Sequence, residues 1–255
     1  MSENPISDGV IEAYEDFYKV DDKGWRLLGA MFKAQHIVDV CNGYTFNKVL
    51  EVGAGDGSIL YYLDKFVFAP ELHALEISQS GIEAIQKRGL KCLSSVGKFD
   101  GYKIPFGDDE FDLVILSHVL EHVEFERSLL REIKRVSKMQ VIEVPKDYRY
   151  GVDRRMNHFL AYGHINMYTP SSLRFLLQSE GLDIKKDKLS LTNPAVSKFI
   201  ASEIKQNRGF LISLKIHLEY RLKTILGDIF GRKKQEQFVN AYTVLTEKTS
   251  ALHIF

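Results

Sequence analysis

Cysteine is scarce in this 255-residue chain, which has only Cys41 and Cys92. The two thiols lie far apart and lack the spacing of a metal site, so they cannot supply the disulfide framework of a small secreted domain. We therefore expect two reduced thiols and a cytoplasmic protein.

An excess of charge of either sign is also missing, since 34 basic residues balance 34 acidic ones. A nucleic-acid partner would require a basic surface, which this balance does not favour. The first ten residues lack the basic and apolar segments of a secretory signal. Charged side chains and His217 interrupt the most apolar late stretch, residues 209–230, which falls short of the roughly 20 mainly apolar residues of a spanning helix. We expect a soluble chain without a nucleic-acid partner or a stable membrane anchor.

Strand and helix patterns alternate along most of the chain. Short apolar runs predict buried strands at 47–52, 72–77, 111–117 and 139–145, with helical patterns between them. This alternation is typical of a mainly parallel sheet with helices on both faces, and the chain is long enough for one such domain.

We expect one domain over residues 1–255. Pro170 in the first turn and Gly181 just past the end predict a helix that follows a long connection after the strand at 139–145, and such a connection is typical of a lid. The predicted regions are an N-terminal helical segment (1–45), a cofactor-binding core with its lid (46–192), a helical insertion (193–238), and a last strand with a tail (239–255).

Three glycines, Gly53, Gly55 and Gly57, stand at alternate positions between the first predicted strand and a helix. Glycine permits a positive φ angle and lets a ligand approach the backbone closely. The spacing differs from the G-x-G-x-x-G of nicotinamide dinucleotide sites, which disfavours an oxidoreductase. Glu76 lies 19 residues beyond Gly57 at the end of the second strand, where a carboxylate can accept both hydroxyls of a ribose. The pattern indicates an adenosine ligand.

At these residues the sequence resembles the class I S-adenosylmethionine-dependent methyltransferases that act on small molecules. Residues 51–57 (Glu-x-Gly-x-Gly-x-Gly) resemble the family's first motif, and Glu76 resembles its ribose-binding acid. Asp100 stands five residues before Pro105, like the acid that contacts the adenine in the family. The resemblance covers residues 48–144 well and residues 163–182 more loosely.

The resemblance implies a Rossmann-like sandwich of seven strands, mostly parallel with an antiparallel last strand, that binds S-adenosylmethionine. It places the end of the strand at 111–117 beside the reacting methyl group. The implied cofactor residues are Glu51, Val52, Gly53, Ala54, Gly55, Gly57, Glu76, Ile77, Asp100, Gly101, Ser117 and His118.

Methyl transfer from a sulfonium mainly requires that the acceptor be held close to the methyl group in a pocket without water, so we expect no metal. A hydroxyl acceptor would benefit from a base with a pKa near neutrality, and we assign His164 and His118 as candidates. His164 could instead hold the lid by hydrogen bonds. His118 and His122 are four residues apart and would share a face of a helix, which could suggest a metal pair, but a packed or capping His122 is favoured.

The predicted acceptor is a small polar molecule, with O-methylation of a sugar or natural-product intermediate preferred. A basic cluster in the connection could bind an anionic acceptor such as a phosphorylated or nucleotide-linked sugar, or could simply be solvated. The N-terminal aromatic residues could line an acceptor pocket or the core. The basic cluster consists of Lys146, Arg149, Arg154, Arg155 and His158. The aromatic residues are Tyr14, Phe17, Tyr18 and Trp25.

Several alternatives stay open. An apolar stripe in the predicted insertion needs the body of the protein or a second subunit to bury it, which suggests a homodimer, although it could also dock another partner or a membrane surface. A catalytically silent methyltransferase-like binding or scaffold protein is compatible with the cofactor motifs. The stripe consists of Leu211, Leu214, Leu218, Leu222, Ile225 and Ile229.

Overall fold

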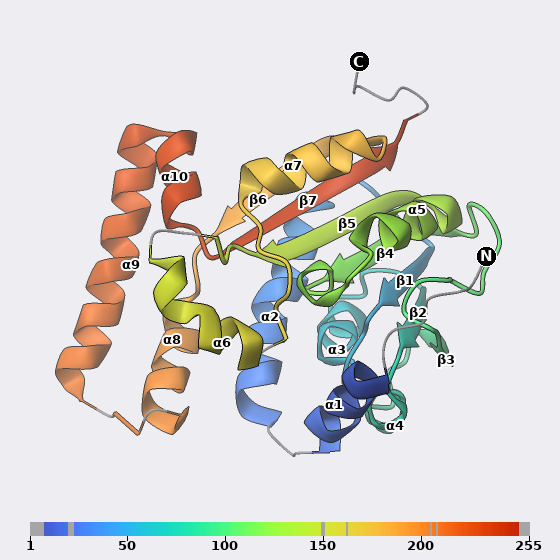
Figure 1. Cartoon of the computed structure of the whole chain (residues 1–255), viewed down its shortest axis with the longest axis horizontal. Coiled ribbons are helices and arrows are strands. Elements are labelled where there is room, and N and C mark those ends of the chain that lie inside the picture. Colours follow the sequence, from blue (N-terminus) through green and yellow to red (C-terminus); the bar gives the residue numbers. More distant parts are fainter. Residues whose placement is uncertain are drawn as a thin grey trace.

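A computed structural model describes residues 8–19, 23–148, 151–161, 163–204, 206–207 and 209–249. Its strands form one seven-stranded sheet in the order β3-β2-β1-β4-β5-β7-β6 (Figure 1). Strands β1 to β5 pair in parallel, and β7 runs antiparallel to both of its neighbours, β5 and β6. The predicted seven-stranded sandwich with an antiparallel last strand is confirmed. The strands are β1 (Lys48–Val52), β2 (Glu71–Glu76), β3 (Leu93–Lys98), β4 (Phe111–Ser117), β5 (Ser137–Pro145), β6 (Leu182–Ser190) and β7 (Ala241–Lys248).

Helices cover both faces of the sheet, so its central strands are apolar at successive positions. Val49 and Leu50 of β1 point to opposite faces and enter two separate hydrophobic clusters. One cluster lies under α5 and α7, and the other lies under α2 and α3 (Figure 1). The helices are α1 (Asp8–Lys19), α2 (Lys23–Val40), α3 (Ser58–Lys65), α4 (Gln79–Lys87), α5 (Glu126–Val136), α6 (Met156–Ala161), α7 (Pro170–Ser179), α8 (Pro194–Phe199), α9 (Phe210–Phe230) and α10 (Arg232–Phe238).

The ends of α7 follow local sequence signals. Thr169 caps the helix through a reciprocal pair of hydrogen bonds with Ser172, and Pro170 occupies the first turn. Gly181 follows the helix with a φ angle of 71°, a conformation that glycine adopts at little cost. The predicted boundaries of this helix are confirmed.

The chain between β6 and β7 is largely helical and stands at one end of the molecule (Figure 1). Its longest helix, α9, buries only Gly227, and its apolar stripe is exposed, with Leu211 at 76% and Ile229 at 68%. The body of the protein therefore does not cover the stripe. None of the described helices is both long and apolar enough to cross a membrane.

The two thiols lie in different environments. Cys41 is 2% exposed, and burial raises the pKa of its thiol to about 12, whereas Cys92 is half-buried. Burial and Asp64 also raise the pKa of Cys92, so we expect a disulfide reagent to label Cys92 in the native state through its accessibility, and Cys41 only after denaturation. Absorbance of the released thiol measures both phases. A Cys92→Ser variant that still reacts rapidly in its native state would contradict this expectation.

Candidate cofactor and acceptor site

The predicted cofactor residues lie at one edge of the sheet, where the parallel strands β3, β2, β1 and β4 end side by side. A ligand at the carboxyl edge of such strands contacts the loops that follow them. Between β1 and α3, Gly53, Gly55 and Gly57 have φ angles of 70°, 57° and 72°. All three conformations favour glycine, so the motif is required by the shape of this turn.

Glu76 connects the end of β2 to the glycine turn. Its carboxylate accepts hydrogen bonds from the backbone N–H of Gly55, at 2.8 Å, and from the backbone and hydroxyl of Ser78, at 3.1 and 2.9 Å. The residue is 3% exposed, and burial raises its pKa although these hydrogen bonds oppose the shift. Ile77, the next residue, is 9% exposed and packs in the core. The first motif and the predicted ribose acid are thus in direct contact.

Glu51 is a buried carboxylate at the end of β1. It is 2% exposed, and within the described chain its Oε2 atom has no hydrogen-bond partner. Burial raises its pKa well above the ordinary value, and the positive charge of the half-buried Lys33 of α2 opposes this shift. Its neighbours Val52 and Ala54 are buried and apolar. An unpartnered carboxylate oxygen in such surroundings suits a cationic ligand group.

Asp100 follows β3 and organises a local turn. Its Oδ1 atom accepts hydrogen bonds from the backbone N–H groups of Tyr102 and Lys103, at 2.9 and 2.7 Å, and Gly101 has a φ angle of 95°. Asp-Gly pairs commonly form such turns. A role for Asp100 toward adenine stays a prediction, and the turn places the residue at the same edge as Glu76.

The end of β4 carries Ser117 and His118. Ser117 is 6% exposed, and its hydroxyl has no hydrogen-bond partner in the part of the chain that is described. His118 has a φ angle of 57°, which is uncommon for a residue other than glycine. The segment after it is a short 3-10 helix, η1 (Leu120–His122), and not an α-helix. The expectation that His118 and His122 share an α-helical face is therefore wrong.

The His118 ring lies between two buried carboxylates. Its Nε2 atom is 3.1 Å from Oε1 of Glu143, and its Nδ1 atom is 3.3 Å from Oε1 of Glu121. Burial and Lys33 lower the pKa of His118, but the two carboxylates outweigh them and raise it. Both ring nitrogens are therefore engaged by carboxylates, and the ring acts here as a counter-charge.

Glu143 joins three elements of the site and was not singled out by the sequence analysis. Besides His118, its carboxylate contacts Nδ1 of His36 in α2, at 3.1 Å, and accepts the hydroxyl hydrogen of Thr243 in β7, at 2.6 Å. Burial would raise its pKa, but the two histidines lower it far more. A glutamate inside the apolar run of β5 is the signal that could have identified it, since buried carboxylates are rare without partners.

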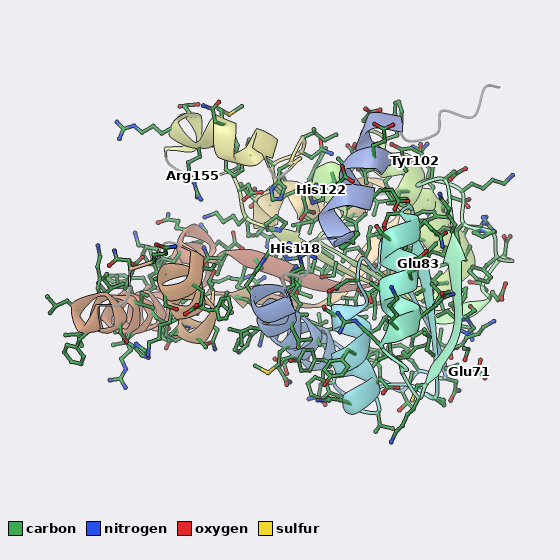
Figure 2. All side chains as sticks on the ribbon, turned by 90° about the horizontal axis from the view of Figure 1, so that it is seen from below. Glu71, Glu83, Tyr102, His118, His122 and Arg155 are labelled. Atoms are coloured by element: carbon green, nitrogen blue, oxygen red, sulfur yellow. The ribbon has the colours of Figure 1, made fainter. Side chains whose placement is uncertain are left out.

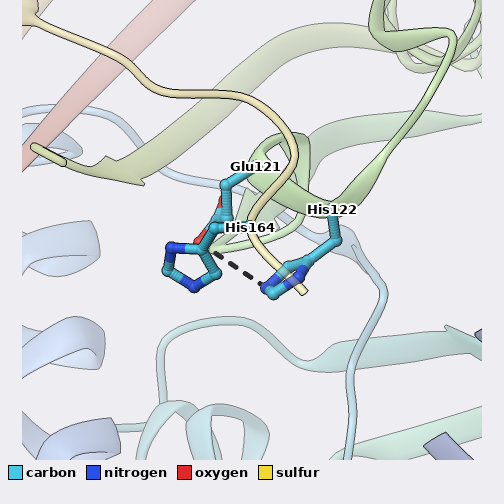
Figure 3. Close-up of side chains that lie close together, drawn as sticks. All are labelled: Glu121, His122 and His164. Carbon is cyan, nitrogen blue, oxygen red and sulfur yellow. Dashed lines mark ion pairs between the residues drawn. The ribbon is translucent and has the colours of Figure 1, made fainter. Parts of the chain in front are cut away.

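His164 lies in the segment after α6 and is oriented by Asp147. Its Nδ1 atom is 2.5 Å from Oδ2 of Asp147, and its ring meets that of His122 edge-on at 4.8 Å. The backbone carbonyl of Glu121 accepts hydrogen bonds from the N–H groups of Ile165 and Asn166, which fixes this segment to η1. His164 therefore lies beside Glu121 and His122 of η1, as Figure 3 shows, and η1 closely follows β4 in the chain.

Helix α1 covers the glycine turn. A Cβ atom at Gly55 would lie 2.7 Å from the hydroxyl of Tyr18, and the ring of Tyr14 meets that of His122 at 6.0 Å. Glu15 accepts backbone N–H groups at the start of α4. Two of the predicted aromatic residues thus face the site, whereas the side chain of Phe17 lies outside the described residues.

The predicted cationic cluster does not converge on this edge. Lys146 is 7% exposed, and its ammonium donates to the carbonyl of Gln237 beyond the sheet edge. Arg155 lies over the ring of Phe159 and is separated from His118 in Figure 2. Arg149 and the side chain of His158 lie outside the described residues.

Residues 50–141 match a family model described as a methyltransferase domain. An uncharacterized methyltransferase of Schizosaccharomyces pombe is 33% identical over 140 residues, which cover 48% of this chain and 46% of that protein. The chain thus spans about half the length of this relative.

Solved structures share the fold over nearly the whole chain. A chain in the complex between the Haloferax volcanii Trm112 methyltransferase activator and the putative methyltransferase has a TM-score of 0.67 and 16% identity, with 95% of this chain and 99% of that chain covered. A SAM dependent methyltransferase from Aquifex aeolicus has a TM-score of 0.57 and 17% identity, with coverages of 92% and 98%. Residues 50–141 therefore resemble a methyltransferase domain, and the chain shares its overall fold with S-adenosylmethionine-dependent methyltransferases.

Proposed function

We propose that the chain binds S-adenosylmethionine and transfers its methyl group to a small polar acceptor, with oxygen preferred over nitrogen. The observation that carries this proposal is the convergence of the glycine turn, Glu76 and the unpartnered oxygen of Glu51 at one sheet edge. The methyltransferase domain and the SAM-dependent Aquifex structure support it.

The cofactor would extend along this edge. Glu51 suits the ammonium of the methionine part, the hydroxyls of the ribose would bind Glu76, and Asp100 with Gly101 would contact the adenine. Val52, Ala54 and Ile77 would add apolar walls and backbone groups. Ser117 and His118 would stand beside the sulfonium, at the end of β4.

The chain's own residues would mainly position the reactants. In the transfer, a lone pair of the acceptor oxygen would form the bond to the methyl carbon while the carbon–sulfur bond breaks, and the acceptor proton would pass to Nε2 of His164. Asp147 holds His164 by Nδ1 and leaves Nε2 directed away from that bond. We propose that His164 positions and activates the acceptor oxygen, and that His118 keeps the carboxylates of Glu121 and Glu143 in place.

The proposal includes a cytoplasmic protein, an anionic acceptor and a homodimer. The two isolated thiols support the location. Arg154 is the cation proposed to bind an anionic acceptor such as a phosphorylated or nucleotide-linked sugar, since arginine pairs well with phosphate. Its exposed side chain would have to reach the site from the segment before α6. The exposed stripe of α9 supports a second copy of the chain.

His164→Ala should lower turnover on a hydroxyl acceptor at least about tenfold and leave the affinity for S-adenosylmethionine unchanged, because one positioned catalytic group contributes roughly 10²- to 10⁴-fold. Release of S-adenosylhomocysteine measures turnover on phosphorylated and nucleotide-linked sugars, and calorimetry measures affinity. His217→Ala, a histidine of α9, is the matched control. Unchanged turnover would remove His164 from the acceptor site, and binding of NAD in place of S-adenosylmethionine would point to an oxidoreductase.

A further inference from the structure

Three side chains from two segments converge beside the end of β4. The carboxylate of Glu121 and the rings of His122 and His164 each offer a ligand atom, and these atoms lie within 4.8 Å of one another (Figure 3). Glu121 and His122 belong to η1, and His164 follows α6. The sequence analysis expected no metal, and the proposed methyl transfer uses His164 and Glu121 separately and gives His122 no role.

Glu121 is fully buried, with 0% exposure. Burial would raise the pKa of Glu121, but its Oε1 atom forms an ion pair with Nδ1 of His118 at 3.3 Å, which lowers it. Neither carboxylate oxygen has a well-formed hydrogen bond in the described chain. A buried carboxylate is destabilising unless its oxygens are well paired, and the ion pair with His118 supplies a contact to Oε1 alone. Such a group is expected to have a further partner, and Oε1 of Glu121 lies 3.9 Å from Nε2 of His122.

Both histidines are oriented through their Nδ1 atoms. Nδ1 of His122 is 3.0 Å from the carbonyl oxygen of Gly163, and Nδ1 of His164 is 2.5 Å from Oδ2 of Asp147. A carbonyl and a carboxylate accept hydrogen bonds, so each ring donates from Nδ1, and Nε2 is the ring atom that would serve as a metal ligand. This is the support that metal-binding histidines usually have, from a carboxylate or a backbone carbonyl.

We propose that Glu121, His122 and His164 bind a divalent transition-metal ion, with zinc as the best match. Two imidazole nitrogens and one carboxylate suit zinc, whereas magnesium and calcium prefer oxygen ligands alone. Ligand atoms around tetrahedral zinc lie roughly 3.4 Å apart, given bonds of about 2.1 Å. Small side-chain rotations would therefore bring the ligand atoms of Glu121, His122 and His164 from within 4.8 Å of one another to the spacing of a zinc site.

The ion would have one open position beside the reactive edge. Its ligand Glu121 contacts His118, and the ring of its ligand His122 meets Tyr14 of α1. If the chain acts as proposed above, the open coordination position of the ion would take the hydroxyl oxygen of the acceptor. A bound cation lowers the pKa of such a hydroxyl, its proton passes to solvent, and the alkoxide attacks the methyl carbon as the carbon–sulfur bond breaks. His164 would then activate the acceptor as a ligand.

Metal binding can be measured without any methyl transfer. The full chain is stripped with a chelator, and zinc is titrated against a chromophoric competitor. We expect one equivalent per chain, and at least about tenfold weaker binding in Glu121→Gln and in His164→Ala. Asp147→Asn should weaken binding about 10- to 100-fold, because it removes only the carboxylate that orients His164. His217→Ala is the control and should bind as the unaltered chain does.

The outcomes separate the two proposals. Thermal melts of the metal-free variants establish that each one is folded, and zinc should raise the melting temperature of the unaltered chain but not of Glu121→Gln. No zinc binding, or equal binding in folded Glu121→Gln and His164→Ala, overturns the metal site. Binding of zinc by a chain that does not bind S-adenosylmethionine leaves the metal site in place and refutes the proposed function.

Discussion

Gly55→Val is expected to lower the affinity for S-adenosylhomocysteine at least about 100-fold, which corresponds to roughly 2.7 kcal/mol. Gly55 has a φ angle of 57°, and its N–H group donates to the carboxylate of Glu76. A Cβ atom there would lie 2.7 Å from the Tyr18 hydroxyl, on the edge where the cofactor would approach the backbone. Calorimetric titration measures the change.

Gly89 provides the matched control for this substitution. It has a similar φ angle of 59°, but a Cβ atom there would meet nothing within 4 Å. Both valines carry the same backbone penalty of about 1–2 kcal/mol, and Gly55→Val should lose somewhat more stability because its Cβ atom also displaces Tyr18. Only Gly55→Val should lose cofactor affinity. Equal affinities in the two variants would mean that the turn does not contact a ligand.

Glu143→Ala is expected to lower the free energy of unfolding by about 3–5 kcal/mol, the usual cost of removing one partner of a buried ion pair. The substitution leaves His36 and His118 without their shared carboxylate and Thr243 without its acceptor. Urea denaturation measures the loss. The site would lose the connection between α2, β4 and β7 at the same time.

An exposed glutamate calibrates this effect. Glu83 lies on the outer side of α4, where replacement by alanine should change stability by no more than about 0.5 kcal/mol. The double variant Glu143→Ala with His36→Ala should lose less than the sum of the single losses, because the two residues share one interaction. Additive losses, or a loss below about 1 kcal/mol in Glu143→Ala, would contradict a stabilising role for the network.

The contact between the glycine turn and Glu76 could be predicted because its signals are local. The glycine turn needs positive φ angles at fixed positions, and Glu76 ends the neighbouring parallel strand, so sequence spacing becomes proximity in the sheet. The ends of α7 were predictable for the same reason, since Thr169, Pro170 and Gly181 act within one turn of the helix.

The acceptor half depends on pairings that no local pattern reveals. The sequence pattern around Glu143 indicates only a strand, and its partner His36 is 107 residues away in the chain. Spacing suggested that His118 belongs with His122, but the 3-10 geometry of η1 and the folding back of the later segment place His164 beside His122 instead. Lys146 looked like part of a basic rim, yet its partner is the carbonyl of Gln237, 91 residues further on.

The helices between β6 and β7 leave and rejoin the sheet at one point. Ser190 and Ala241 are paired in the antiparallel ladder, and the N–H group of Asn240 donates to the carbonyl of Ser190. An excursion whose ends are already adjacent adds little closure entropy as it lengthens or shortens. Evolution can therefore replace this whole segment without shifting the register of the strands that carry the glycine turn and Glu76.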